Sequence, residues 1–353
     1  MTPAPGRPRT VAVATAIVTL GLLALLSRGP DGALGTNYLA SVLLTVTLFA
    51  LFSLGVSLTY GQTGLVNFGH VAFLAIGAYS AAMVPLQSGL GWWAAIPVAL
   101  MVSAAYALLV GLPTLRLRED YLAIVTIAAA EILRTVLMNG EPWTGGELGL
   151  TGFERPFIGP MGGDPDVRPN GAWSALASAL EVRPYGLFLL VLSLIVLAMS
   201  VLVLHRLRHS PWGRVTRAIR DDEDATAALG KDVFRYKLSS LMLGGALGTL
   251  AGLLHAWAYP SVTPGNFLPL VTFYAWAIMI LGGATTHLGP LVGSVLLWGL
   301  FEGVRAVSVG GGGGPFANEG ALQVALVGLL LVLLMRFRPQ GLVGDARELS
   351  HAR

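Results

Sequence analysis

Ten apolar stretches follow one another along this chain of 353 residues, and most charged residues lie in the links between them. A helix that crosses the hydrocarbon core of a membrane, roughly 30 Å thick, needs about 20 apolar residues. Several stretches are shorter than that, so we expect some helices to be broken or half-length. The pattern predicts an all-α polytopic membrane protein with about ten transmembrane helices. The stretches cover residues 11–26, 38–59, 71–84, 92–111, 121–138, 185–205, 238–259, 267–281, 291–304 and 322–335.

The composition excludes several classes of protein. Apolar residues make up 54% of the chain and charged residues 12%, whereas soluble domains carry about 25% charged residues. These proportions exclude a disordered chain and argue against a soluble enzyme. The chain has no cysteine, so it forms no disulfide and no thiolate metal site. The net charge is +3, but the basic residues lie in short loops and do not indicate a nucleic-acid partner.

The basic residues indicate how the spans are oriented, because cytoplasmic loops of membrane proteins carry an excess of lysine and arginine. Two arginines precede the first apolar stretch, and two more precede the fifth. The segment 206–237 holds eight basic residues, whereas the segment 139–184 holds three basic residues against six acidic ones. We therefore expect segment 206–237 and both termini in the cytoplasm, with 139–184 as an extracytoplasmic loop.

Three further segments carry more local expectations. The stretch 11–26 is short and follows arginines, as in a secretory signal, but residues 27–30 make a poor cleavage site. We expect this stretch to be retained as a helix. Within the outer loop we expect one short surface helix over 171–181, and the glycine run 310–314 is typical of a flexible connection.

The cytoplasmic segment is longer than the joining of two spans requires. Between Arg214 and Leu229 no residue type breaks a helix, and Gly230 is placed to end one. Arg214 and Arg217 share one face of that helix, and the alanines within 225–228 offer a flat surface of small side chains. Two interpretations remain open. The segment is either a solvated loop that obeys the positive-inside rule, or a helix that docks into a groove of another protein.

Few ionisable residues lie inside the apolar stretches, where each is costly. Glu131 and Arg134 are spaced i, i+3 in the fifth stretch and can pair with each other. Such a pair either lines a polar path or gate, or joins the helix to a neighbour as a structural contact.

Residues 61–70 interrupt two apolar stretches without a single formal charge. Gln62 and Asn67 could satisfy the freed backbone groups of a helix broken at membrane depth, a feature of transporters. Asn67 is equally suited to cap the third helix at a plain cytoplasmic turn. His70 is interpreted either as a satisfied packing residue or as a ligand-binding residue.

Five sets of motifs resemble a single family. In the cytoplasmic segment they are Gly213-Arg214, Arg217-Ala218-Ile219-Arg220-Asp221-Asp222-Glu223, Ala225, Ala228, Gly230 and Lys237. The others lie at 61–73 with 77–79, at 144–150, at 282–293 and at 337–342. Together they resemble the permeases of ABC importers for branched-chain amino acids, the Liv type. The resemblance extends over nearly the whole chain from about residue 35.

The resemblance implies a division of labour between subunits. Residues 1–353 would form one permease domain in a bacterial-type inner or plasma membrane. Its partners would be a second permease subunit, two cytoplasmic ABC ATPases and an extracytoplasmic solute-binding protein. The helix near 214–229 would sit in a cleft of one ATPase, so that closure of the ATPase pair switches the access of the translocation path.

The resemblance also implies roles for particular residues. No catalytic residue, metal ligand or cofactor is expected on this chain, since ATP and magnesium would bind to the partner ATPases. Gly230-Lys231 lacks the upstream glycine and following hydroxyl residue of a phosphate-binding loop. The candidate path residues are Gln62, Asn67, His70, Glu131 and Arg134. The candidate coupling residues are Gly213, Arg214, Arg217, Arg220, Asp221, Asp222, Glu223, Ala225, Ala228 and Gly230.

Other functions fit parts of the same sequence. A permease of this family that carries urea or short amides instead of leucine, isoleucine or valine would have the same uncharged spans. A stand-alone secondary transporter needs an acidic ion site within the spans, and Glu131 alone is a good candidate for one. This interpretation leaves the cytoplasmic helix unexplained. An intramembrane enzyme needs a metal set or a nucleophile with a base, and the sequence contains no H-E-x-x-H motif.

Overall fold

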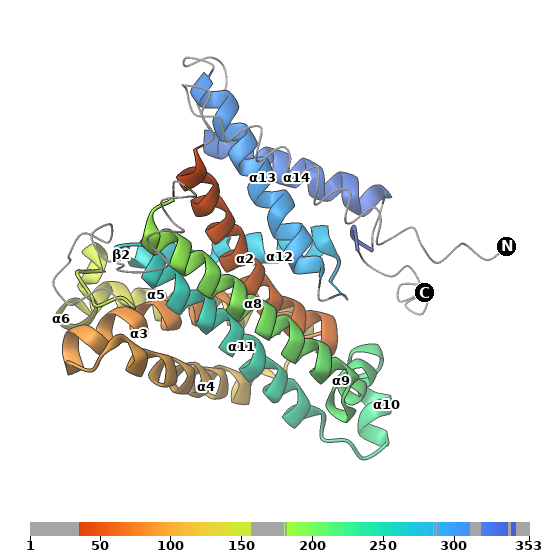
Figure 1. Ribbon diagram of the computed structural model, residues 1–353. Helices are drawn as coiled ribbons and strands as arrows, with labels where there is room; N and C mark the ends of the chain where they lie inside the picture. The colour runs from red at the N-terminus through yellow and green to blue at the C-terminus, as the bar shows by residue number, and fades with distance from the viewer. Residues whose placement is uncertain are drawn as a thin grey trace.

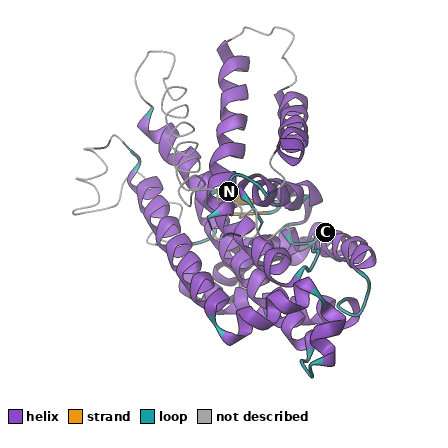
Figure 2. Ribbon diagram, turned by 90° about the vertical axis from the view of Figure 1, so that its right-hand side faces the viewer, coloured by secondary structure: helices purple, strands orange, loops and turns teal. Residues whose placement is uncertain are grey.

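A computed structural model describes residues 35–156, 180, 182–284, 286, 288–310, 319–337 and 340–343. Within these residues the protein is almost entirely helical (Figure 2). The predicted helix over 11–26 and the glycine run after residue 310 lie outside the described residues. The surface helix expected over 171–181 also lies outside them, apart from residue 180.

Each of the other nine predicted stretches contains a helix, which confirms the all-α fold. Among the described residues, seven helices are long and apolar enough to cross a membrane, and two shorter apolar helices cover Pro269–Gly282 and Gly289–Glu302. The chain is thus a multi-pass membrane protein. The main helices are α2 (Thr36–Thr63), α3 (Val71–Ser88), α4 (Ala95–Thr114), α5 (Glu119–Asn139), α8 (Pro184–His209), α11 (Val233–Ala258), α12 (Pro269–Gly282), α13 (Gly289–Gly310) and α14 (Glu319–Phe337).

Short elements lie at the two ends of this bundle (Figure 1). At one end, α8 and α11 are joined through α9 (Pro211–Asp221) and α10 (Glu223–Ala228). At the opposite end are α6 (Glu141–Thr144), the 3-10 turns η1 (Trp92–Ala94), η2 (Gly146–Leu148) and η3 (Pro264–Phe267), and two short strands. The strands β1 (Leu150–Thr151) and β2 (Ser261–Val262) pair antiparallel, with Leu150 opposite Val262.

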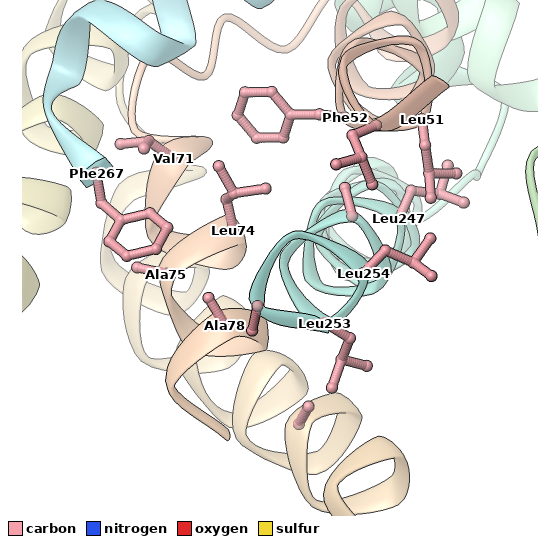
Figure 3. Packing of buried hydrophobic residues seen from close by; sticks show 14 of the residues in the cluster. Leu51, Phe52, Val71, Leu74, Ala75, Ala78, Leu247, Leu253, Leu254 and Phe267 are labelled. Carbon is pink, nitrogen blue, oxygen red and sulfur yellow. The ribbon is translucent and has the colours of Figure 1, made fainter. Parts of the chain in front are cut away.

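The core of the bundle is formed by α2, α3 and α11, which are the most buried of the long helices. These helices approach so closely that glycine is required at the contacts. A Cβ atom on Gly77 of α3 would lie 2.1 Å from the Thr249 carbonyl oxygen, and one on Gly252 of α11 would lie 2.0 Å from that of Leu74. Small residues allow such packing of membrane helices. Figure 3 shows the side chains that fill the space around these contacts, among them Leu51, Phe52, Leu74, Ala78, Leu247, Leu253 and Leu254.

The outer helices have the opposite character. On α4, α5, α8 and α14, large apolar side chains point away from the bundle, including Leu109, Ile124, Met199 and Val332. A soluble domain rarely exposes so many large apolar side chains, because their contact with water costs free energy. These faces are suited to contact with lipid or with another membrane subunit.

The close α3–α11 contact yields a stability prediction. In Gly252→Ala the added methyl group overlaps the backbone of α3, so the free energy of unfolding should fall by about 1–3 kcal/mol, as for other overpacked cores. Gly328→Ala on α14 is the matched control, because a Cβ there meets no atom within 4 Å. Thermal unfolding in detergent should show a lower midpoint for Gly252→Ala alone. Equal midpoints for the two variants would contradict the packing described.

Candidate functional site

The backbone between α2 and α3 leaves the helical conformation and returns into the bundle. Gly64, at φ +70°, ends α2 with the bond of an αL cap, because its N–H donates to the Tyr60 carbonyl, and the Leu65 N–H donates to the Thr59 carbonyl. Six further residues pass before α3 begins at Val71. We call residues 65–70 the buried connection.

The far end of the buried connection reaches about halfway along α11. A Cβ atom on Gly248 would lie 3.0 Å from the His70 Nε2 atom. At a rise of 1.5 Å per residue, Gly248 lies roughly 22 Å from the start of this 26-residue helix. The connection is therefore a broken-helix arrangement inside the bundle, not a turn confined to its end. Non-helical backbone at such depth requires hydrogen bonds from the surrounding protein.

Helix α12 supplies one of these hydrogen bonds to Asn67. The Trp276 indole Nε1–H donates to the Asn67 carbonyl oxygen at 3.1 Å, and its ring stacks on Phe68 with the ring centroids 4.7 Å apart. The Asn67 side chain accepts from the Gly69 N–H at 2.9 Å. Asn67 thus closes a local turn and does not cap α3, whose cap position is occupied by His70.

Two threonines satisfy N–H groups at the end of the connection. The Val71 N–H donates to the Thr272 hydroxyl of α12 at 3.0 Å, and the Phe68 N–H donates to the Thr126 hydroxyl of α5 at 3.2 Å. The first turns of α3 and α12 therefore meet inside the bundle. Sequence reasoning identified the interrupted segment but not Thr126, Thr272 and Trp276, which come close to it only in the folded chain.

His70 is enclosed completely at the start of α3. Its ring lies between those of Phe52 and Phe73, with centroid distances of 5.1 and 5.5 Å, and against Gly55 of α2. Neither ring nitrogen has a hydrogen-bond partner among the described residues. His70 is therefore a packing residue in this conformation, although its polar atoms are not satisfied.

Gln62 lies in the last turn of α2, just before the buried connection, and faces the α9 end of the bundle. With Ser57, Arg208, Trp212 and Thr286 it lines a small cavity beside the start of α9. The Gln62 Oε1 atom is buried there and has no partner among the described residues. The predicted path residues are thus divided between the interior of the bundle and its α9 end.

The predicted pair on α5 is formed. Arg134 Nε donates to both carboxylate oxygens of Glu131, at 3.0 and 2.9 Å, and Nη2 also contacts Glu131. The pair lies beyond Thr126 along α5 by about 8 Å, at 1.5 Å per residue. The side chain of Arg134 is 19% exposed and that of Glu131 is 40% exposed. Both charges therefore remain partly open at a surface of the bundle.

The segment between α8 and α11 contains two helices where the sequence predicted one over 214–229, so that prediction is wrong. Asp222 has an extended backbone, with φ −159° and ψ 109°, and separates α9 from α10. Its carboxylate accepts from the Ala225 N–H at 2.9 Å and caps the second helix. Aspartate favours such a capping position over a helix interior. Gly230, at φ +77°, follows α10 as predicted.

Three of the predicted coupling residues face the bundle. A Cβ atom on Gly213 would lie 2.4 Å from the Arg208 carbonyl oxygen, so α9 packs directly on the end of α8. The Arg217 guanidinium donates to the carbonyls of Gly213 and Arg208, at 3.2 and 3.4 Å. Arg220 Nη1 donates to the Gly61 carbonyl of α2 at 2.7 Å.

The remaining predicted coupling residues are exposed, and a leucine lies among them. Leu229 is 81% exposed at the end of α10, beside Ala225 and Ala228. Sequence reasoning named Leu229 only as the last residue of the expected helix and did not single it out. It also missed Trp212, whose indole N–H donates to the Ser239 hydroxyl at 2.9 Å and fastens α9 to α11. The other exposed residues are Arg214, Asp221, Asp222, Glu223 and Gly230.

The family model and the similar proteins agree with one another. The family described as "Branched-chain amino acid transport system / permease component" matches residues 38–335. The chain is 34% identical to the high-affinity branched-chain amino acid transport system permease protein LivM of Salmonella typhimurium, over 85% of this chain and 68% of that protein. LivM of Escherichia coli K12 is 33% identical with the same coverage. LivH of Escherichia coli K12 is 24% identical, over 84% of this chain and 91% of LivH. No solved structure matches.

The α3–α12 contact yields a further prediction. Thr272→Val removes the acceptor of the buried Val71 N–H and should lower the free energy of unfolding by about 1–3 kcal/mol. Thr272→Ser keeps a hydroxyl at the same position and should retain most of the stability. Thermal unfolding in detergent compares the two variants. If the serine variant is destabilised as much as the valine variant, the lost methyl packing outweighs the hydrogen bond.

Proposed function

This chain belongs to the family of permease components of branched-chain amino acid transport systems, and from that premise we propose that it is one of two permease subunits in an ATP-driven ABC importer. The importer would lie in the inner or plasma membrane and carry leucine, isoleucine and valine. The observation that carries the ATP-driven part of the proposal is the outward face of α9 and α10. This surface belongs to a segment firmly packed at the end of the spans, yet it leaves Ala225, Ala228 and Leu229 exposed.

The docking surface consists of Ala225, Ala228 and Leu229. Two small side chains next to an exposed leucine offer a shallow surface with one protruding apolar group. Burial of a leucine side chain contributes about 1.5–3 kcal/mol. Asp221 and Asp224 are exposed beside it, so the complementary groove on the ATPase should have an apolar pocket with a basic rim.

The segment can transmit force because it is held to the spans from several sides. Gly213 packs on the end of α8, Trp212 bonds to Ser239 of α11, and Lys237 of α11 pairs with Glu223 of α10. A push on the exposed surface would therefore reach α8 and α11 without being absorbed by a loose loop. A solvated link between spans would not need these contacts.

The translocation path is proposed to run along α5, between this chain and the second permease. An Asp, Lys or Arg side chain near the centre of a membrane helix costs about 2.5–3.5 kcal/mol on insertion scales. Partly exposed charges such as Glu131 and Arg134 are therefore better placed beside a polar path than in lipid. A paired carboxylate and guanidinium offers contacts to both the ammonium and the carboxylate of an amino acid without a net charge.

The proposed function is tested by reconstitution of the permease pair with its ATPases and binding protein in vesicles. We expect leucine uptake that requires ATP, with competition by isoleucine and valine and none by urea. Uptake by the permeases alone, driven by an ion gradient, would contradict the proposal.

The docking surface makes its own prediction. Leu229→Asp places a carboxylate where the ATPase should offer an apolar pocket, and the ATPase should no longer co-purify with the permease. Leu148→Asp is the control, because Leu148 is 88% exposed in η2 at the opposite end of the bundle. Retention of the ATPase by both variants would place the docking surface elsewhere.

The path along α5 can be tested by labelling, because the chain contains no cysteine. Ile132→Cys on α5 and Met199→Cys on α8 have similar exposure, 64% and 61% for the native side chains. A fluorophore on residue 199 should be quenched by brominated lipid in the complete transporter. One on residue 132 should be protected, although both should be quenched in this chain alone. Equal quenching in the complete transporter would place α5 against lipid.

A further inference from the structure

Three helix ends come together where α9 contacts the spans. Arg220 in the last turn of α9 reaches the end of α2, and the end of α12 lies against α2 at the same place. We call α9 and α10 together the docking segment. We propose that Arg220 is a positioning residue that transmits movement of the docking segment to α2 and α12, and through them to the buried connection. This inference rests on the proposed function.

The first contact lies between α9 and α2. Arg220 Nη1 donates to the Gly61 carbonyl oxygen at 2.7 Å, across 159 positions of sequence. The last carbonyls of a helix lack partners within it and carry partial negative charge, so a guanidinium is favoured there. The Arg220 stem also packs near Gly64, whose added Cβ would lie 3.5 Å from the Arg220 Cγ. Arg220 therefore caps α2 from another helix.

The second contact lies between α2 and α12. A Cβ atom on Gly61 would lie 2.3 Å from the carbonyl oxygen of Ala284, two residues after α12 ends at Gly282, so the backbone of α2 touches the turn that follows α12. The Ser57 hydroxyl donates to the same oxygen at 3.1 Å. Because neither contact depends on a long flexible side chain, α2 and the end of α12 should move together.

The third contact lies between α12 and the buried connection. Helix α12 has 14 residues, about 21 Å in length, and bonds to Asn67 through Trp276 and to Val71 through Thr272. A short helix of this kind behaves as a rod that joins the cytoplasmic end of the bundle to the start of α3. The contacts thus form a continuous route from the docking segment to the interior.

Arg220 bonds to α2, whereas two other arginines of the segment bond elsewhere. Arg217 bonds to Gly213 within α9 itself and to Arg208 in the last turn of α8. Arg235 is 84% exposed and pairs with Asp232 one turn away. Loss of either residue would leave the contact between α9 and α2 intact.

The test uses the complete transporter with its ATPases and binding protein. In Arg220→Ala we expect the ATPases to co-purify and to hydrolyse ATP, while leucine uptake per ATP falls about tenfold or more, as for the loss of a hydrogen bond to a charged group. Arg220→Lys keeps a cationic donor and should restore part of the uptake, and Arg235→Ala should resemble the native chain. A merely structural role would lower the unfolding temperature and all activities together.

Three outcomes would overturn the inference. They are native uptake per ATP in Arg220→Ala, loss of the ATPase from that variant, and equal loss of uptake in Arg235→Ala. Failure of the proposed function is distinguishable from these, because the native complex itself would then show no ATP-dependent uptake.

A covalent link gives a second, independent test. A Cβ on Gly64 would lie 4.0 Å from the Arg220 Cβ, within the usual range of about 3.5–4.5 Å for a disulfide. In Gly64→Cys/Arg220→Cys, oxidation should restore uptake that is low in the reduced protein. If the bridge forms without effect on uptake, the contact does not transmit movement, and this result would overturn the inference.

Discussion

A peptide backbone that leaves its helix inside a membrane must obtain its hydrogen bonds from other parts of the protein. The buried connection is subject to this constraint, and the surrounding helices meet it. Thr126 comes from α5, whereas Thr272 and Trp276 come from α12. These helices are therefore fixed around the connection, and α12 begins inside the bundle because its first turn meets the start of α3.

Helices α2 and α12 also connect the interior of the bundle to the end at which α9 and α10 lie. Helix α12 extends from the buried connection to the contact with Gly61, and α2 ends where Arg220 reaches it. By contrast, α4, α8 and α14 present apolar side chains outward. The chain thus has an inner group of helices connected by contacts to α9, and an outer group that separates it from its surroundings.

The positions of the helices were predictable from sequence, because long apolar stretches have few alternatives in a membrane. The paired charges Glu131 and Arg134 were predictable as well, since their spacing places them on one side of α5. The break at Asp222 was not predictable, because it arises when Asp222 caps α10 instead of lying in the interior of one continuous helix. The partners of the buried connection were also beyond sequence reasoning, since Trp276 and Asn67 lie 209 positions apart.

The roles of the arginines in α9 were likewise not predictable from the sequence. Arg214, Arg217 and Arg220 are equivalent in the sequence pattern, yet one is exposed, one bonds to its own segment and one reaches α2. Which role each takes depends on the ends of α2 and α8, and these are set by the packing of the whole bundle.

The antiparallel pair of β1 and β2 joins the loop after α5 to the chain that leads into α12. Gly149, just before β1, fits against the Val262 carbonyl with no room for a side chain, and two residues after that carbonyl η3 begins the approach to α12. A displacement of the loop after α5 would therefore be transmitted to the start of α12, whose far end lies near Gly61 of α2. Movements that begin at the two ends of the bundle would converge on a single short helix.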